Sequence, residues 1–220
     1  MKKFMSLVLC LALGSFALAG CSDNSEPFQE KTYTPDVPVS GIDLDVRDRE
    51  IQVSPSEDGQ IHIRYSENSK EYYEISVSEE HVLTMAGTSN KGWTDYLGGK
   101  PAAEDRKIYL EIPSGALSSL ALSTTNENIS LSPLAVTGDV SLSANGGSLS
   151  FEALDAGSSL DLYAKNGDIS GTVTGSYDDF TIAAEVKKGS CNLPERKDGG
   201  ERSLTVSANN GDVSLAFSNG

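Results

Sequence analysis

The sequence predicts an all-β protein built as a single-chain β-solenoid with rungs of about 20 residues. Segments 120–131, 140–151 and 160–171 align without gaps at an offset of 20 residues, and 204–215 matches the same template after a step of 44 residues. In each segment, apolar and polar residues alternate on both sides of a polar corner, as in strands with one buried face. No 3.6-residue period is present, which excludes long α-helices.

The template places apolar residues at offsets 0, 2 and 9 from its first apolar position. The step from offset 2 to offset 9 is odd, so a corner must turn the chain for both halves to point inward. Glycine and asparagine at the corner adopt the positive φ that such a turn requires, and equivalent asparagines could stack as a ladder between rungs. The apolar positions are Leu120, Leu122 and Ile129; Val140, Leu142 and Leu149; Leu160, Leu162 and Ile169; and Leu204, Val206 and Val213. Offset 11 holds Leu131, Phe151 and Leu215, with Gly171 as the exception.

The N-terminal part repeats the template once and then continues with looser alternation. Ile42, Leu44, Ile51 and Val53 occupy offsets 0, 2, 9 and 11, and the strand-rich body extends to Phe217. A less regular stretch interrupts it at 86–107. Fixed spacing favours a solenoid, in which successive rungs superpose. A β-sandwich or prism in which each unit is a hairpin remains the alternative.

The first twenty residues have the composition of a secretion signal. Lys2 and Lys3 precede an apolar run from Phe4 to Ala19, which is shorter than the roughly 20 residues that span a bilayer. The sequence Leu18-Ala19-Gly20-Cys21 resembles the bacterial lipoprotein lipobox. That resemblance implies that Cys21 carries thioether-linked diacylglycerol and becomes the acylated N-terminus. The alternative is an ordinary signal peptide that ends near a cysteine.

The chain therefore divides into a signal at 1–20, a lipidated N-terminus and polar tether at 21–40, and a solenoid domain at 41–220. The tether is polar, contains three prolines and lacks periodicity. Its 19 residues after Cys21 could reach at most about 60 Å from a membrane. We expect the protein in the cell envelope, anchored by lipid to the outer face of the plasma membrane or to the outer membrane.

Charge and cysteine content limit the partners and the redox chemistry. The formal net charge is −15 at pH 7, and loss of Lys2 and Lys3 with the signal makes it −17. This acidity disfavours nucleic acid, whose binding requires cationic neutralisation of phosphates. Because Cys10 leaves with the signal and Cys21 carries lipid, Cys191 has no partner for an internal disulfide. Segment 180–202 has its corner two residues late, and this insertion places Cys191 at a core position of its rung.

Residues suited to catalysis or metal binding are sparse. His62 lies between Ile61 and Ile63, so alternation points it outward. Asp43, Asp45 and Asp48 could in principle hold calcium, but a solvated strand face is the favoured interpretation. No spacing resembles a zinc site, and we predict neither metal nor cofactor.

The repeat region also lacks the charged groove of polysaccharide-cleaving β-helices. Residues 114–178 contain one basic residue, Lys165, and serine and threonine fill the outward positions. These hydroxyls provide neither an acid nor a base near neutral pH, so we predict that the protein is not an enzyme.

The irregular stretch 86–107 is the candidate for recognition. It contains the single tryptophan, Trp93, with Tyr96 nearby in a glycine-rich loop. Long loops without secondary structure are often functional, and exposed aromatic rings can contact a sugar or a protein. The alternative is that Trp93 and Tyr96 cover an exposed strand edge of the solenoid.

The repeated pattern L-x-L-x-x-x-N-G-D-I-x-L, preceded by Leu110-Glu111-Ile112-Pro113, resembles uncharacterised bacterial "putative adhesin" domains. These are related to adhesin-head-like β-helix proteins and are often carried on lipoproteins. The resemblance covers residues 42–220. It implies a β-solenoid and a surface or periplasmic role, and it transfers no catalytic residues.

The leading functional hypothesis is a lipid-anchored envelope module that binds or adheres without catalysis. Its membrane contact would be the lipid on Cys21, and its partner an envelope glycan or protein. A structural or sensory spacer is the second hypothesis, and a polysaccharide-acting β-helix enzyme is the third.

Overall fold

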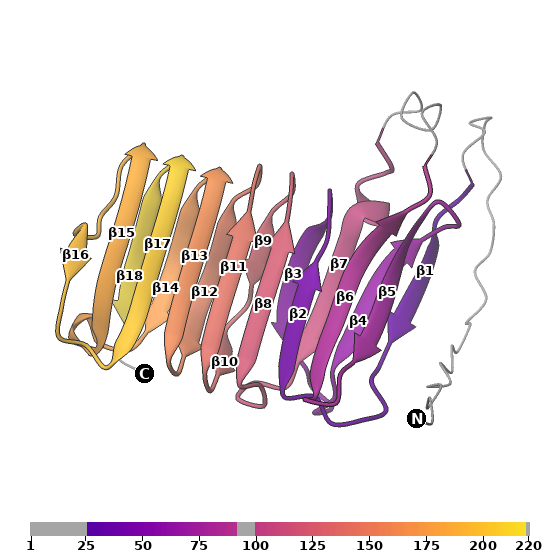
Figure 1. Cartoon of the computed structure of the whole chain (residues 1–220), viewed down its shortest axis with the longest axis horizontal. Coiled ribbons are helices and arrows are strands. Elements are labelled where there is room, and N and C mark those ends of the chain that lie inside the picture. The colour runs from indigo at the N-terminus through magenta and orange to yellow at the C-terminus, as the bar shows by residue number, and fades with distance from the viewer. Residues whose placement is uncertain (1–25, 92–99, 219–220) are drawn as a thin grey trace.

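The computed structural model describes residues 26–91 and 100–218, which form two long β-sheets joined by corners and short connections (Figure 1). No α-helix occurs in these ranges; two 3₁₀ turns are present, η2 (Glu104–Arg106) and η3 (Tyr177–Asp179). Within the same ranges, no helix is long and apolar enough to cross a membrane. Cys21, Trp93 and Tyr96 lie outside the described residues.

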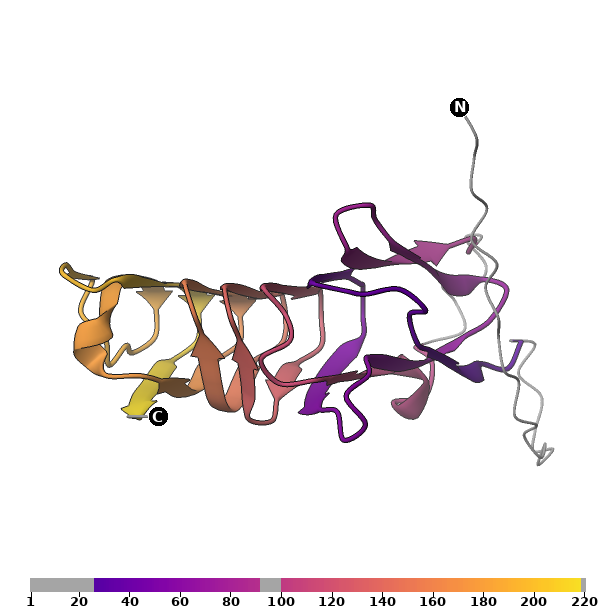
Figure 2. The ribbon, with the colours of Figure 1, turned by 90° about the horizontal axis from the view of Figure 1, so that it is seen from below.

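The two sheets face each other and enclose the apolar core between them (Figure 2). Sheet A has the spatial order β1 (Gln29–Tyr33), β4 (His62–Glu67), β7 (Lys107–Ile112), β3 (Glu50–Pro55), β9 (Ile129–Leu131), β12 (Leu149–Ala156), β14 (Ile169–Thr174) and β18 (Val213–Ser218), with β10 (Leu134–Val136) beside β12. Sheet B has the order β16 (Arg196–Lys197), β15 (Phe180–Lys188), β17 (Arg202–Asn210), β13 (Ser159–Asn166), β11 (Asp139–Ala144), β8 (Ser119–Thr124), β2 (Gly41–Asp45), β6 (Val82–Ser89) and β5 (Glu71–Val77).

Each sequence repeat forms one rung, with its first strand in sheet B and its second in sheet A. The two strands of a repeat do not pair with each other, so the repeats are solenoid rungs and not hairpins. Equivalent template positions are in direct parallel register, and their side chains are buried. Offset 0 aligns Leu120, Val140, Leu160 and Leu204, and offset 9 aligns Ile129, Leu149, Ile169 and Val213. The predicted all-β solenoid is confirmed.

The rungs do not stack in chain order at either end of the solenoid. Rung β2–β3 lies between rung β6–β7 and rung β8–β9. At the other end, rung β17–β18 stacks directly on β13–β14, while β15 pairs with the far side of β17. Residues 44 positions apart in the sequence are therefore direct neighbours across two paired strands, as Leu160 and Leu204 are. Segment 180–202 forms the outermost rung.

The polar corners are joined by the predicted side-chain ladder. Asn210 Nδ2 donates to Asn166 Oδ1 at 2.7 Å, and the backbone N–H of Asp212 donates to Asp168 Oδ1 at 2.8 Å. Close stacking of the corners also requires glycine, because a Cβ on Gly167 would lie 2.1 Å from the carbonyl oxygen of Gly147. Corner composition and rung spacing thus depend on each other.

The segment assigned to the tether contributes a strand to the folded body. Gln29–Tyr33 forms β1, which pairs antiparallel with β4 over its full length, and Lys31 forms an ion pair with Glu67 at 2.5 Å. Tyr33 packs against the core. The folded domain therefore begins before residue 41, and the tether assignment was wrong for this stretch. Local composition indicated a linker, whereas pairing with a distant strand makes it part of sheet A.

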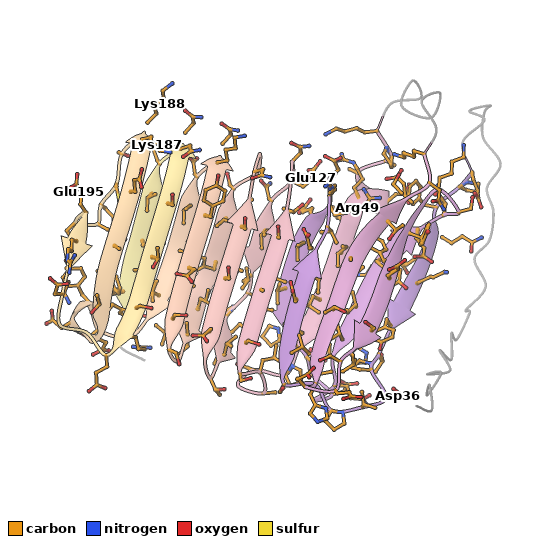
Figure 3. All side chains as sticks on the ribbon, in the orientation of Figure 1. Asp36, Arg49, Glu127, Lys187, Lys188 and Glu195 are labelled. Atoms are coloured by element: carbon orange, nitrogen blue, oxygen red, sulfur yellow. The ribbon has the colours of Figure 1, made fainter. Side chains whose placement is uncertain are left out.

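A buried arginine fastens the N-terminal hairpins to the rungs. Arg49, 4% exposed, precedes β3 (Figure 3). Its Nη2 lies 2.9 Å from Glu71 Oε2 on β5, and its Nε donates to the Tyr73 hydroxyl at 2.6 Å. The ring of Tyr73 packs edge-on against Tyr65 at 5.2 Å. The core tolerates the positive charge of Arg49 because its guanidinium N–H groups are hydrogen-bonded to Glu71 and Tyr73.

Candidate functional site

A trough of about 390 Å³ lies on the outer face of sheet A. It crosses five neighbouring strands, β7, β3, β9, β12 and β14, which lie side by side in the middle of the molecule (Figure 1). We call this hollow the serine trough because five of its twelve lining residues are serines. Its lining comprises Gln52, Val53, Ser54, Tyr109, Ser130, Leu131, Ser132, Ser150, Phe151, Glu152, Ser170 and Gly171.

The repeat itself creates the trough, because the outward position between offsets 9 and 11 is serine on three neighbouring rungs, those of β9, β12 and β14. Gln52, Ser130, Ser150 and Ser170 are in direct register across β3, β9, β12 and β14. Serine side chains are short and leave open space above the sheet, whereas the longer Tyr109 stands on β7, the first of the five strands. The result is a hollow with hydroxyl and amide groups pointing into it.

The departure of Gly171 from the template has a steric explanation. A Cβ on Gly171 would lie 2.4 Å from Cδ2 of Phe151, its register partner on β12. The pairing of β12 with β14 shifts between Phe151 and Leu154, which is the mark of a bulge. The large ring on one rung and the glycine on the next are therefore complementary. Both residues lie on the core side of sheet A, beneath the trough, where Phe151 is 5% exposed.

Tyr109 forms the wall between the serine trough and a second hollow. It is in register with Gln52 on β3 and with Arg64 on β4. The Arg64 guanidinium lies 3.8 Å from the centre of the Tyr109 ring, and Arg64 Nη1 pairs with Glu30 at 3.1 Å. The second hollow, about 310 Å³, is lined by Thr32, His62, Arg64, Tyr109 and Glu111. Tyr109 is half-buried and lines both hollows, with Arg64 stacked on one face of its ring.

His62 points outward, as alternation predicted, and lies in a hydrogen-bonded chain. Its Nδ1 is 2.7 Å from Thr34 Oγ1, and its Nε2 is 3.0 Å from Asp58 Oδ2. The backbone N–H of Gln60, then His62 and Ser56, lower the pKa of Asp58. Both ring nitrogens of His62 are thus occupied by protein groups. This chain holds β1, β4 and the 56–60 turn together and leaves no ring nitrogen for a ligand.

The acidic cluster near the N-terminus lacks the geometry of a cation site. Asp43 and Asp45 face solvent on β2, whereas Asp48 has φ 54° and accepts a hydrogen bond from Asn126 Nδ2 at 2.5 Å. Across residues 26–91 and 100–218, no group of three or more His, Cys, Asp or Glu side chains could hold a metal ion. Asp48 is a turn residue fastened to the next rung.

Cys191 occupies the position that the sequence predicted. It forms a parallel bridge with Val213 and packs, partly buried, against the core. By contrast, the importance of Tyr109, Gln52 and Glu152 was not anticipated. Their outward orientation was readable, since Tyr109 alternates with buried Ile108 and Leu110. The hollow around them was not, because it depends on strands far apart in the chain.

Comparison with known proteins identifies the fold. The family model described as Toastrack DUF4097 matches residues 39–216. The crystal structure of a "putative cell adhesion protein" from Clostridium sporogenes superposes with a TM-score of 0.60 at 12% identity, covering 87% of this chain and 100% of that chain. A "putative adhesin" from Bacteroides fragilis has a TM-score of 0.40 at 12% identity, covering 88% and 98%. No curated protein is significantly similar in sequence.

Proposed function

Because this chain belongs to the Toastrack DUF4097 family, we propose that it is a non-catalytic binding module of the cell envelope, held to a membrane by lipid on Cys21. The observation that carries the binding function is the serine trough. It combines the aromatic side chain of Tyr109 with a row of hydroxyl and amide groups on the outer face of sheet A. Binding sites commonly have this mixture of apolar surface and a few directed polar groups.

The chemistry of the trough favours binding over catalysis. Glu152 is the one charged side chain in its lining, and the nearby imidazole of His62 has both nitrogens engaged. General acid–base catalysis requires a group within hydrogen-bond reach of the substrate that can exchange a proton. Serine hydroxyls and a glutamine amide can bind and orient a ligand, but they do not exchange a proton with it near neutral pH. The description of the Clostridium sporogenes structure as a "putative cell adhesion protein" agrees with this role.

The lipid anchor rests on the sequence Leu18-Ala19-Gly20-Cys21 and on the polar residues after it. The described chain enters the fold through β1, at the end of the elongated body away from β16 (Figure 1). An anchor attached there would leave the outer face of sheet A open to the envelope. Trp93 and Tyr96, in the connection from β6 to β7, are proposed as further ligand contacts, since β7 carries Tyr109.

Two measurements test this function. Metabolic labelling with a fatty-acid analogue should mark the wild-type chain and not the Cys21→Ser variant; labelling of that variant would contradict the anchor. For binding, the mature lipoprotein, purified in mild detergent, should co-sediment with isolated envelope fragments. Trp93→Ala should weaken co-sedimentation. If wild-type protein does not co-sediment at all, the binding function fails and a structural spacer is the better account.

A further inference from the structure

We propose that the serine trough binds an extended, uncharged polysaccharide strand that lies across the β-strands, parallel to the long axis of the solenoid. This inference deepens the binding function proposed above and rests on it. It is carried by the shape of the trough, by its rung spacing and by the absence of cationic side chains from its lining.

The direction of the ligand follows from the direction of the trough. Its lining residues come from five adjacent strands of sheet A, so it is elongated across the strands. Neighbouring strands are about 4.8 Å apart, and five strands therefore span about 19 Å. One register row of polar side chains faces outward across β3, β9, β12 and β14. It consists of Gln52, whose amide donates to Glu50 at 2.6 Å, and of Ser130, Ser150 and Ser170. This repeat is close to the advance of one pyranose unit in an extended β-linked chain, so successive sugars would meet successive rungs.

The two kinds of surface in the trough match the two kinds of surface on a sugar ring. Pyranose rings present apolar C–H faces and a rim of hydroxyl groups. Tyr109 provides an aromatic ring for a C–H face, and Arg64, stacked at 3.8 Å, holds that ring in place from the other hollow. The serine hydroxyls of the trough donate and accept hydrogen bonds along the hydroxyl rim of the sugar.

The charge of the trough favours an uncharged polysaccharide over an anionic one. The lining contains Glu152 and no lysine, arginine or histidine. The chain as a whole has a formal charge of −15 at pH 7. A phosphate- or uronate-rich polymer would therefore be repelled and would find no cation in the trough. The exposed lysines at the end of β15, Lys187 and Lys188, extend beyond the strand end and lie outside the trough (Figure 3).

The test uses β-1,4-linked N-acetylglucosamine and glucose oligomers of two to eight units, with polygalacturonate as the anionic chain. Titration calorimetry on the mature lipoprotein in detergent should show affinity that rises with length and levels off near four or five units. Tyr109→Ala should weaken binding at least tenfold. Ser150→Arg, which fills the trough, should abolish it. Two matched controls on the outer face of sheet B, Tyr163→Ala and Ser141→Arg, should bind like wild type.

The outcomes separate this inference from the function on which it rests. Binding of polygalacturonate in preference to the uncharged oligomers would overturn the inference, as would equal loss in the trough and control variants. Failure to bind any oligomer, together with retained co-sedimentation with envelope fragments, would also overturn it while leaving the binding function in place. Failure of both assays would overturn both. Circular dichroism of each variant checks that loss of binding is not loss of folding.

Discussion

The side-chain amide of Asn192 pairs with both backbone groups of Leu215. Nδ2 donates to the carbonyl oxygen of Leu215 at 2.7 Å, and Oδ1 accepts from its N–H at 3.0 Å. The main chain of this segment pairs with Val213. The N–H of Val213 donates to the carbonyl oxygen of Ser190, and its carbonyl oxygen accepts from the N–H of Asn192. Beyond Val213, the side chain of Asn192 therefore takes the place of a neighbouring main chain in the hydrogen bonding along β18. Exposed strand edges invite pairing with other chains, and this contact covers the outer edge of β18.

Replacing Asn192 with leucine should open this edge. Removing one partner of a buried backbone group costs about 1–3 kcal/mol, so the free energy of unfolding should fall by about that amount. Chemical denaturation measures it, and light scattering should show concentration-dependent self-association. Asn209→Leu is the matched control, because its side chain makes no hydrogen bond to the described residues. Equal stability and equal mass for the two variants would show that the amide does not protect the edge.

Truncation of Arg49 should be far more damaging than truncation of a surface arginine. Arg49→Met removes the buried partner of the Tyr73 hydroxyl and one of the two ion pairs of Glu71, which keeps Lys91 at 2.6 Å. The free energy of unfolding should therefore fall by about 3 kcal/mol, the lower end of the range for a broken buried ion pair. Arg196, paired with Asp198 in solvent, is the control, and its loss should leave the free energy of unfolding nearly unchanged. Urea denaturation distinguishes them. Similar losses for both variants would contradict a fastening role for Arg49.

A methyl group at the stacked corner should be poorly tolerated. In Gly167→Ala the new Cβ would lie 2.1 Å from the carbonyl oxygen of Gly147, so one rung must move. Overpacking of this kind costs about 1–3 kcal/mol. Gly87→Ala is the control, because its Cβ would meet neighbours only at ordinary contact distances, near 3.9 Å. Thermal denaturation should show a lower Tm for the first variant alone; an unchanged Tm would mean that the corners stack more loosely.

Acidic pH should weaken the outermost rung through Asp212. The backbone N–H of Ser190, and then its hydroxyl, lower the pKa of this carboxyl below its usual value of 3.8. A folded-state pKa lower than the unfolded one gives stability that is present above the unfolded value and is lost as pH falls through the folded value. The drop in Tm between pH 7 and pH 3 should therefore be smaller in Asp212→Asn than in wild type.

The control for this titration is Asp161→Asn, whose carboxylate faces solvent on β13. This variant should lose as much Tm on acidification as the wild-type chain does. If Asp212→Asn and Asp161→Asn respond to pH in the same way, the hydrogen bonds from Ser190 do not couple Asp212 to stability.

The sequence by itself determined the composition of a rung and the face on which each side chain lies. Alternation is a local property of a strand, so Ile108 and Leu110 could be placed inside and Tyr109 outside without knowing the fold. Stacked rungs must superpose, so the sequence repeat alone predicted that equivalent residues such as Leu120 and Val140 lie opposite each other on paired strands. Cys191 could be placed for the same reason.

Only the tertiary structure decided which rungs are neighbours and what lies between them. Identical templates stack equally well in several orders, so the insertion of β2–β3 and β17–β18 inside the terminal rungs left no local mark in the sequence. The pairing of β1, the burial of Arg49 and the hollow beside Tyr109 all depend on strands distant in the chain. The core repeat is encoded locally because burial follows alternation, whereas the candidate binding surface arises from the juxtaposition of five separate strands.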